Sequence, residues 1–118
     1  MKTLVFGGSL NPERYSNIAI NRLEDNDIEV VSYGLRSGNV GNVSIDTILK
    51  DYEDVHTITL YMNPKRQQEF YTYLLGLKPK RIIMNPGTEN DELAAMARDQ
   101  AIEVVKACTL VMLSTDQY

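Results

Sequence analysis

The sequence predicts a three-layer α/β/α fold with a mostly parallel sheet of about five strands. Two observations predict this fold class. Short apolar runs with the length and composition of buried strands alternate with segments whose apolar residues recur at helical spacing. The connections are short, and such alternation produces parallel strands with right-handed crossovers and helices on both faces. The chain has 118 residues and no linker or repeat, so we expect one domain spanning residues 1–118.

The first strand is predicted at Thr3 to Phe6, and two glycines follow it directly. Glycine has no Cβ, so Gly7 and Gly8 can turn tightly or let another molecule approach the backbone. The first helix is expected to run from about Ser16 to Asp25, with Ser16 as its N-cap. A second strand follows at residues 28–33, where the apolar residues suggest burial on both faces.

The middle of the chain is less regular. Residues 34–42 form a glycine-rich segment that is too polar for a core element, so we expect a loop. Val43 to Ile45 is predicted as a short edge strand, and Asp46 to Lys50 as one turn of helix. A long third strand is expected at Val55 to Tyr61, with apolar residues on both of its sides.

A proline marks the start of the next helix. Pro64 suits the first turn of a helix over residues 65–77, because its missing N–H has no intrahelical partner there. The remaining predicted elements are a strand at 81–84, a helix at 91–100, a strand at 102–105 and a final helical turn at 109–113. The tail from Ser114 to Tyr118 is expected to be frayed.

The composition argues against several classes of function. A net charge of −4 argues against a basic surface for nucleic acid. No apolar run approaches the roughly 20 residues of a membrane span. A single cysteine cannot form an internal disulfide, and one cysteine and one histidine far apart in sequence make a metal cluster of these residues implausible. The chain enters a strand at Thr3 without a secretory signal, so we expect a cytoplasmic protein.

The predicted architecture is a small Rossmann-like domain, and such sheets bind ligands beyond the carboxyl ends of their strands. Four predicted loops leave those ends: Gly7–Tyr15, Gly34–Asn42, Met62–Pro64 and Asn85–Asn90. These loops hold most of the glycines and prolines of the chain. We therefore expect a ligand at this rim of the sheet.

The first two loops favour a phosphorylated ligand other than NAD. A strand, a glycine turn and a helix in succession aim free N–H groups at a phosphate, but the third glycine of a dinucleotide fingerprint is missing. An NAD site also needs an acidic residue after the second strand, and this chain has Arg36 nearby instead. The guanidinium groups of Arg36 and Arg14 suit phosphate oxygens. Arg36 could equally be a solvated loop residue, whereas for Arg14 a phosphate contact is slightly favoured over that alternative.

No catalytic set is indicated by the spacing of reactive residues. His56 stands at the start of a strand beside acidic residues and is interpreted as a surface or partly covered residue. Cys108 follows a strand near Lys106, where a cation could activate a thiol, but a small buried core residue is the better interpretation. We therefore expect a binding protein without evident catalysis.

The first loop resembles a known signature. Gly7-Gly8-Ser9 with Asn11-Pro12-Glu13-Arg14-Tyr15-Ser16 is similar to the Gly-Ala-Ser, Asn-Pro, Arg-Tyr-Ser pattern of the small CoA-binding domain proteins. These proteins resemble the CoA-binding domain of the succinyl-CoA synthetase alpha subunit standing alone. Later segments that match the pattern are 34–41, 85–92 and 102–108. Two departures are Gly8, where alanine is commoner, and the third-loop sequence Tyr61-Met62-Asn63-Pro64.

The resemblance implies a Rossmann-like domain that binds coenzyme A or an acyl-CoA at the carboxyl rim of the sheet. The adenine nucleotide would cross the first two loops, and the pantetheine arm would run toward the later ones. The residues that it implies for the site are Gly8, Ser9, Asn11, Arg14, Tyr15, Arg36, Met62, Asn63, Pro64, Asn85, Pro86, Gly87 and Thr88. Ligase activity is not implied, because the synthetase's phosphorylated histidine lies in a different domain. The expected partner is this small nucleotide ligand, and a homodimer is the default expectation because symmetric dimers are the commonest oligomers.

Three other functions stay open on the sequence. The first is an NAD(P)-dependent oxidoreductase or an NAD(P)-binding regulatory domain, and the oxidoreductase would need Tyr15 or Tyr61 as its proton donor. The second is an interaction domain without a ligand. The third is an acyl-CoA transferase or thioesterase that uses Cys108.

Overall fold

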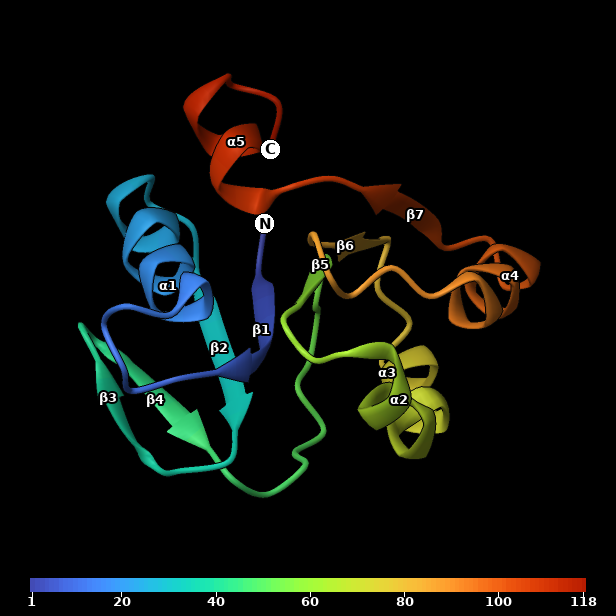
Figure 1. Cartoon of the computed structure of the whole chain (residues 1–118), viewed down its shortest axis with the longest axis horizontal. Helices are drawn as coiled ribbons and strands as arrows, with labels where there is room; N and C mark the ends of the chain where they lie inside the picture. Colours follow the sequence, from blue (N-terminus) through green and yellow to red (C-terminus); the bar gives the residue numbers. More distant parts are fainter.

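The computed structural model describes all residues from Met1 to Tyr118. A seven-stranded sheet runs through the molecule in the order β3-β4-β2-β1-β5-β6-β7 (Figure 1). Its strands are β1 (Thr3–Gly8), β2 (Val30–Gly34), β3 (Gly38–Val40), β4 (Val43–Asp46), β5 (Thr57–Leu60), β6 (Arg81–Met84) and β7 (Glu103–Lys106). Every neighbouring pair is parallel except β3 with β4. The predicted fold class is confirmed, with seven strands in place of about five.

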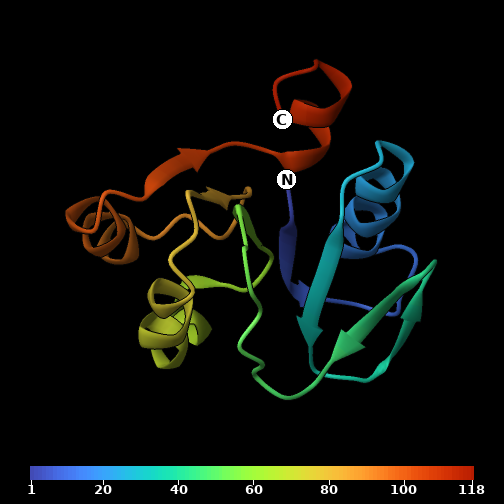
Figure 2. The same ribbon diagram turned by 180° about the vertical axis from the view of Figure 1, so that it is seen from behind.

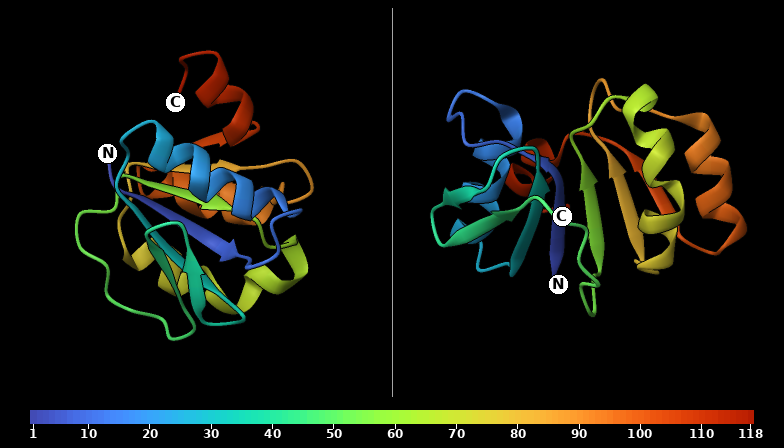
Figure 3. Two further views of the ribbon diagram at one scale, coloured as in Figure 1. Left: turned by 90° about the vertical axis from the view of Figure 1, so that its left-hand side faces the viewer. Right: turned by 90° about the horizontal axis from the view of Figure 1, so that it is seen from below.

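Helices cover both faces of this sheet (Figure 3). They are α1 (Tyr15–Asp25), α2 (Pro64–Gln67), the 3₁₀ turn η1 (Gln68–Phe70), α3 (Tyr71–Gly76), α4 (Asp91–Asp99) and α5 (Thr109–Ser114). α1 and α5 lie on one face, and α2, α3 and α4 lie on the other. None of these helices is both long and apolar enough to cross a membrane.

The central strand β1 supplies apolar side chains to both layers, because successive residues of a strand point to opposite faces. Leu4 and Phe6 are fully buried in the cluster formed with α3 and α4. Val5, between them, is fully buried in the smaller cluster with Ile20 and Leu23 of α1. The two clusters hold the carboxyl end of β1, and the loop that follows it, in a fixed position between the layers.

The segment predicted as one loop over residues 34–42 contains strand β3, so that part of the prediction is wrong. Val40 pairs with Val43 in an antiparallel hairpin beyond β2 (Figure 2). Gly41 and Asn42 form its two-residue turn, with Gly41 at φ +57°. Gly-Asn between two valines is a hairpin signal that outweighs the polarity of the segment.

Two other predictions are also wrong. Asp46 to Lys50 forms no helical turn: Asp46 ends strand β4, and Ile48 is largely exposed, so the segment has no apolar face to bury. The tail is not frayed, because Tyr118 packs on the sheet. Its ring centroid lies 4.5 Å from the guanidinium carbon of Arg81, and its hydroxyl is hydrogen-bonded to Thr3. The two ends of the chain are correspondingly near each other in Figure 1.

The other boundaries differ by a few residues from those predicted. β2 begins at Val30, two residues later than expected, and β5 spans Thr57–Leu60. The helix predicted over residues 65–77 consists of α2, η1 and α3 in succession. Pro64 is the first residue of α2, as its missing N–H predicts.

Candidate functional site

A cleft of about 820 Å³ opens beyond the carboxyl ends of β1, β2, β5 and β6, where Rossmann-like sheets bind their ligands. All four predicted loops contribute to it. Its lining residues are Gly7, Gly8, Ser9, Leu10, Asn11, Arg14, Tyr15, Ser16, Tyr33, Gly34, Leu35, Arg36, Tyr61, Met62, Asn63, Arg66, Pro86, Gly87 and Thr88.

The first loop presents unpaired main-chain N–H groups to this cleft. The amides of Ser9, Leu10, Tyr15 and Ser16 donate to no protein atom. Tyr15 and Ser16 form the first turn of α1, whose N-cap residue Arg14 makes no capping hydrogen bond through its side chain. Free N–H groups at the start of a helix, together with the helix dipole, favour an anion.

Glycine is required at position 8 by the packing of β1 against β2. A Cβ built on Gly8 would lie 2.2 Å from the hydroxyl oxygen of Ser32, which donates a hydrogen bond to the carbonyl of Val5. A Cβ on Gly34 would lie 2.2 Å from the carbonyl oxygen of Gly8. The missing side chain of Gly8 therefore serves close contact inside the protein, and the prediction that it lets a ligand approach is not needed to explain it.

Three arginines line the cleft and no acidic residue does. Arg14 and Arg36 come from the first and second loops and Arg66 from helix α2 after the third loop, and all are exposed. The ion pairs of the protein involve lysines alone, so no carboxylate neutralises these arginines. All charged residues that line the cleft are therefore positive, in a protein whose net charge is −4.

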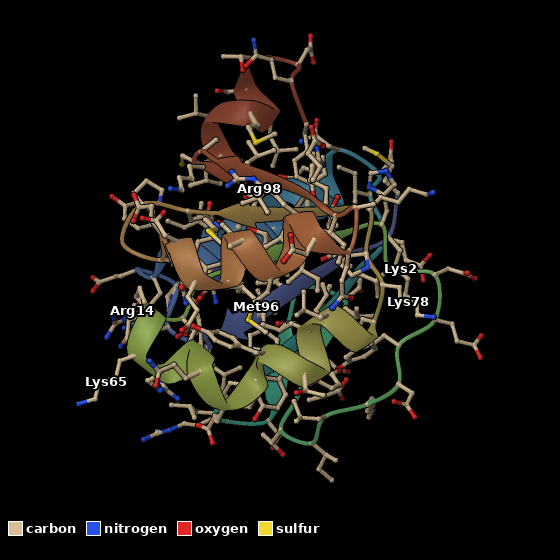
Figure 4. The ribbon with its side chains drawn as sticks, turned by 90° about the vertical axis from the view of Figure 1, so that its right-hand side faces the viewer. Lys2, Arg14, Lys65, Lys78, Met96 and Arg98 are labelled. Carbon is tan, nitrogen blue, oxygen red and sulfur yellow. The ribbon has the colours of Figure 1, made fainter.

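Figure 4 shows where these cations lie along the molecule. Arg14 and Lys65, the residue before Arg66, are at one end of the molecule, and Lys2 and Lys78 are at the other. The strands point their carboxyl ends toward Arg14. The positive charge of the cleft is thus separate from the lysines at the amino ends of the strands.

The third and fourth loops form the opposite wall of the cleft. Asn63 caps α2, because its side-chain oxygen accepts a hydrogen bond from the N–H of Arg66 at 3.0 Å. Gly87 lies at φ +91°, a conformation that side chains disfavour, and a Cβ there would meet no atom within 4 Å. This part of the fourth loop is exposed, and the N–H of Gly87 donates to the carboxylate of Glu89 at 2.7 Å.

The cleft brings together most of the residues implied by the sequence resemblance. The predicted residues that line it are Gly8, Ser9, Asn11, Arg14, Tyr15, Arg36, Met62, Asn63, Pro86, Gly87 and Thr88. Pro64 and Asn85 do not line it. Pro64 instead starts helix α2.

Asn85 is buried, and its side chain is used inside the protein. Its amide nitrogen donates to the hydroxyl of Thr59 at 2.7 Å and to the carbonyl of Leu60 at 2.8 Å. Its oxygen accepts a hydrogen bond from the N–H of Thr109 at 2.8 Å. Asn85 therefore joins the start of the fourth loop to β5 and α5, and both of its N–H donors are used inside the protein.

Several lining residues were not individually assigned to the site from the sequence, although some of them lie in the predicted loops. They are Gly7, Leu10, Ser16, Tyr33, Gly34, Leu35, Tyr61 and Arg66. Ser16 was predicted to be the N-cap, but α1 begins at Tyr15, so Ser16 lies within the first turn and faces the cleft. Arg66 could have been found, because the argument that assigned Arg14 to a phosphate applies equally to an arginine that follows the third loop.

Of the residues considered for catalysis, Tyr15 lines the cleft and is exposed, whereas Tyr61, Cys108 and His56 are poorly placed for it. Tyr61 lines the cleft, but its side chain packs on the cluster with Ile20 and Leu23, its hydroxyl is buried without a hydrogen-bond partner, and burial raises the pKa of Tyr61 to about 12. Cys108 is the N-cap residue of α5 and does not line the cleft. His56 precedes β5, at the amino end of the sheet. No group of His, Cys, Asp and Glu is arranged to hold a metal ion.

Comparisons with known proteins identify a family and several solved structures of similar fold. The sequence profile of a family described as "CoA binding domain" matches residues 1–114. The crystal structure of an uncharacterized protein shares 43% identity and a TM-score of 0.96, over 99% of this chain and 97% of that one. A Thermus thermophilus structure has 16% identity and a TM-score of 0.86, over 99% of this chain and 90% of the other. A hypothetical protein from Pyrococcus horikoshii has 19% identity and a TM-score of 0.85, over 96% and 81%. A search of curated proteins finds no match.

Proposed function

Because the chain belongs to the CoA-binding domain family, we propose that it binds coenzyme A or an acyl-CoA in the cleft at the carboxyl rim of the sheet. The observation that carries this proposal is the charge of the cleft. Three arginines line it without any carboxylate to neutralise them. Such a site suits a ligand with several phosphate charges.

The number of charges distinguishes CoA from NAD. CoA carries a diphosphate and a phosphate monoester on its ribose, and the monoester alone contributes about −1.5 to −2 at neutral pH. NAD carries the diphosphate alone, and its nicotinamide ring is positive. The second loop also offers Arg36 where an NAD site would have an acidic residue.

In the proposed binding mode, the ligand crosses all four loops. The free N–H groups of Tyr15 and Ser16 would hold the diphosphate, and Arg36 would hold the ribose phosphate. The pantetheine arm would then run between Met62 and Gly87 on the opposite wall. No side chain is assigned a chemical step, so the proposed function is binding alone.

Thermal unfolding with CoA, acetyl-CoA, NADP and NAD at matched concentrations tests this proposal. A ligand at 100 times its dissociation constant adds about 2.7 kcal/mol to the stability, which corresponds to a rise of about 10 °C in Tm. CoA and acetyl-CoA should produce such a rise and NAD should not. A strong response to NAD with none to either CoA species would refute the proposal.

NADP is the second candidate, since Arg36 could hold its 2′-phosphate as well as the 3′-phosphate of CoA. Substitutions distinguish the effect of the arginines in the cleft on CoA binding from the effect of the overall charge of the protein. Arg36→Gln and Arg66→Gln should each weaken CoA binding about tenfold, because each removes a charged hydrogen-bond donor. Arg22→Gln is the matched control, since Arg22 is exposed on α1 outside the cleft. A response to NADP that exceeds the response to CoA would favour a nicotinamide cofactor.

A further inference from the structure

We propose that Gln67 is a positioning residue, which sets the separation of the third and fourth loops and thereby shapes the pantetheine side of the cleft. Gln67 does not line the cleft itself and is completely buried. The inference rests on the proposed function, because it concerns how that site accommodates its ligand. It assigns a role to a residue that the sequence offered no reason to select.

The amide group of Gln67 joins the two loops directly. Its nitrogen donates to the carbonyl of Met62 at 2.7 Å and to the carbonyl of Thr88 at 3.0 Å. Met62 and Thr88 both line the cleft, on the third and fourth loops. A single planar amide therefore fixes the distance between two main-chain segments that flank the proposed pantetheine path.

The oxygen of the same amide is held from the other side. It accepts a hydrogen bond from the side-chain nitrogen of Asn90 at 2.9 Å, and that nitrogen also donates to the hydroxyl of Tyr71 at 2.8 Å. The oxygen of Asn90 caps α4 by accepting from the N–H of Leu93 at 3.1 Å. Gln67 is thus held in one orientation by α3 and α4, and both of its donors remain directed at the two loops.

The chemistry of the position requires an amide of this length. A buried donor or acceptor without a hydrogen-bond partner has given up its hydrogen bonds to water and gained none in return. This desolvation penalty destabilises the folded protein, so the network is stable only when every member is paired. Methionine has a similar length and volume but donates no hydrogen bond. Gln67→Met would free the carbonyls of Met62 and Thr88 from their shared donor while leaving the core filled.

The test compares two ligands by isothermal titration calorimetry on the full chain. CoA spans all four loops in the proposed mode, whereas adenosine 3′,5′-bisphosphate would contact only the first two. Gln67→Met should weaken CoA binding about tenfold, because the third and fourth loops lose the shared donor that holds them in place. Binding of the bisphosphate should change by less than about twofold, because the free N–H groups of the first loop are unaffected.

A general loss of stability would weaken both ligands alike, so the ratio of the two affinities separates positioning from folding. Ile102→Ala is the control, since Ile102 is buried at the amino end of the sheet and outside the cleft; it should leave the ratio unchanged. If Gln67→Met does not fold, Gln67→Asn replaces it, because the shorter amide cannot reach both carbonyls. An unchanged ratio in a folded Gln67 variant overturns the inference while CoA binding itself stands. Failure of the unsubstituted protein to bind CoA overturns the proposed function, and this inference with it.

Discussion

The substitution Gly8→Ala tests whether the bare backbone at this position serves packing or ligand approach. The added Cβ would lie 2.2 Å from the hydroxyl oxygen of Ser32, well inside van der Waals contact. The backbone of Gly8 is not in the left-handed region, so alanine is not strained there for conformational reasons. The only obstacle is therefore the Ser32 side chain.

The cost follows from what Ser32 must give up. Its hydroxyl is fully buried and donates to the carbonyl of Val5 at 2.9 Å. If the hydroxyl rotates away from the new methyl group, that hydrogen bond is lost and a buried polar group is left unpaired, which costs about 1–3 kcal/mol. If it does not rotate, the strain of overpacking is of similar size, about 1–3 kcal/mol. Gly8→Ala should therefore lower the free energy of unfolding by this amount.

Removal of the hydroxyl should relieve the clash. In the double variant Gly8→Ala, Ser32→Ala, the nearest remaining atoms are the Cβ of residue 32 at 3.5 Å and Cδ1 of Ile20 at 3.6 Å, which are ordinary contacts. Ser32→Ala alone should cost about 1 kcal/mol for the lost hydrogen bond. The double variant should lose no more free energy of unfolding than Ser32→Ala alone. It should therefore be about 1–3 kcal/mol more stable than the sum of the two single effects predicts.

Urea unfolding of the unsubstituted protein, the two single variants and the double variant measures these free-energy differences. If the double variant loses as much free energy of unfolding as the two single variants together, the two effects are additive and the reasoning is refuted. CoA titration of the double variant adds a second check. Since the new methyl group points at position 32 and not into the cleft, the double variant should bind CoA as tightly as the unsubstituted protein. A large loss of affinity would show that Gly8 also serves ligand approach.

Three further predictions concern other parts of the chain. Burial, and then the charge of Arg81, lower the pKa of His56 below 6.5, so the unfolded chain takes up a proton first as the pH falls. The free energy of unfolding should therefore decrease between about pH 7 and pH 5, and His56→Gln should flatten this dependence. Tyr118→Ala should lower the stability by about 2–4 kcal/mol in urea unfolding, through loss of the ring beneath Arg81; an unchanged midpoint would contradict this packing. Asn63→Ala should cost about 1 kcal/mol by removing the cap on the N–H of Arg66, whereas Asn63→Asp should be nearly neutral.

Much of the fold was predictable because its signals are local. The apolar run at Thr3 to Phe6 and the proline at position 64 each determine their own surroundings, and both lie where expected. Strand β3 was missed because polarity was given more weight than the Gly41-Asn42 turn between two valines. The packed tail depends on Tyr118 meeting Arg81, residues that are distant in sequence, and no local pattern reveals such a contact.

The candidate site was predictable to the extent that it is made of loop residues after strands. Arg14 and Gly87 were selected on that basis, and both line the cleft. Asn85 shares the same position after a strand, yet its amide is fully used inside the protein. Gln67 shows the opposite case, since nothing in its neighbourhood marks a buried glutamine that bridges two loops. The position of a residue in the sequence indicates which end of the sheet it occupies. Only the structure shows whether its side chain faces the cleft or forms hydrogen bonds inside the protein.

The arginine-lined cleft has a consequence for the life of the protein in the cell. When the cleft is empty, three exposed arginines share it without an ion-pair partner from the chain, and repulsion between their charges opposes the folded state. An anionic ligand removes that repulsion and also stabilises the fold by mass action. The unliganded form should therefore be the one that proteases clear fastest, so the abundance of this protein would follow the supply of its ligand.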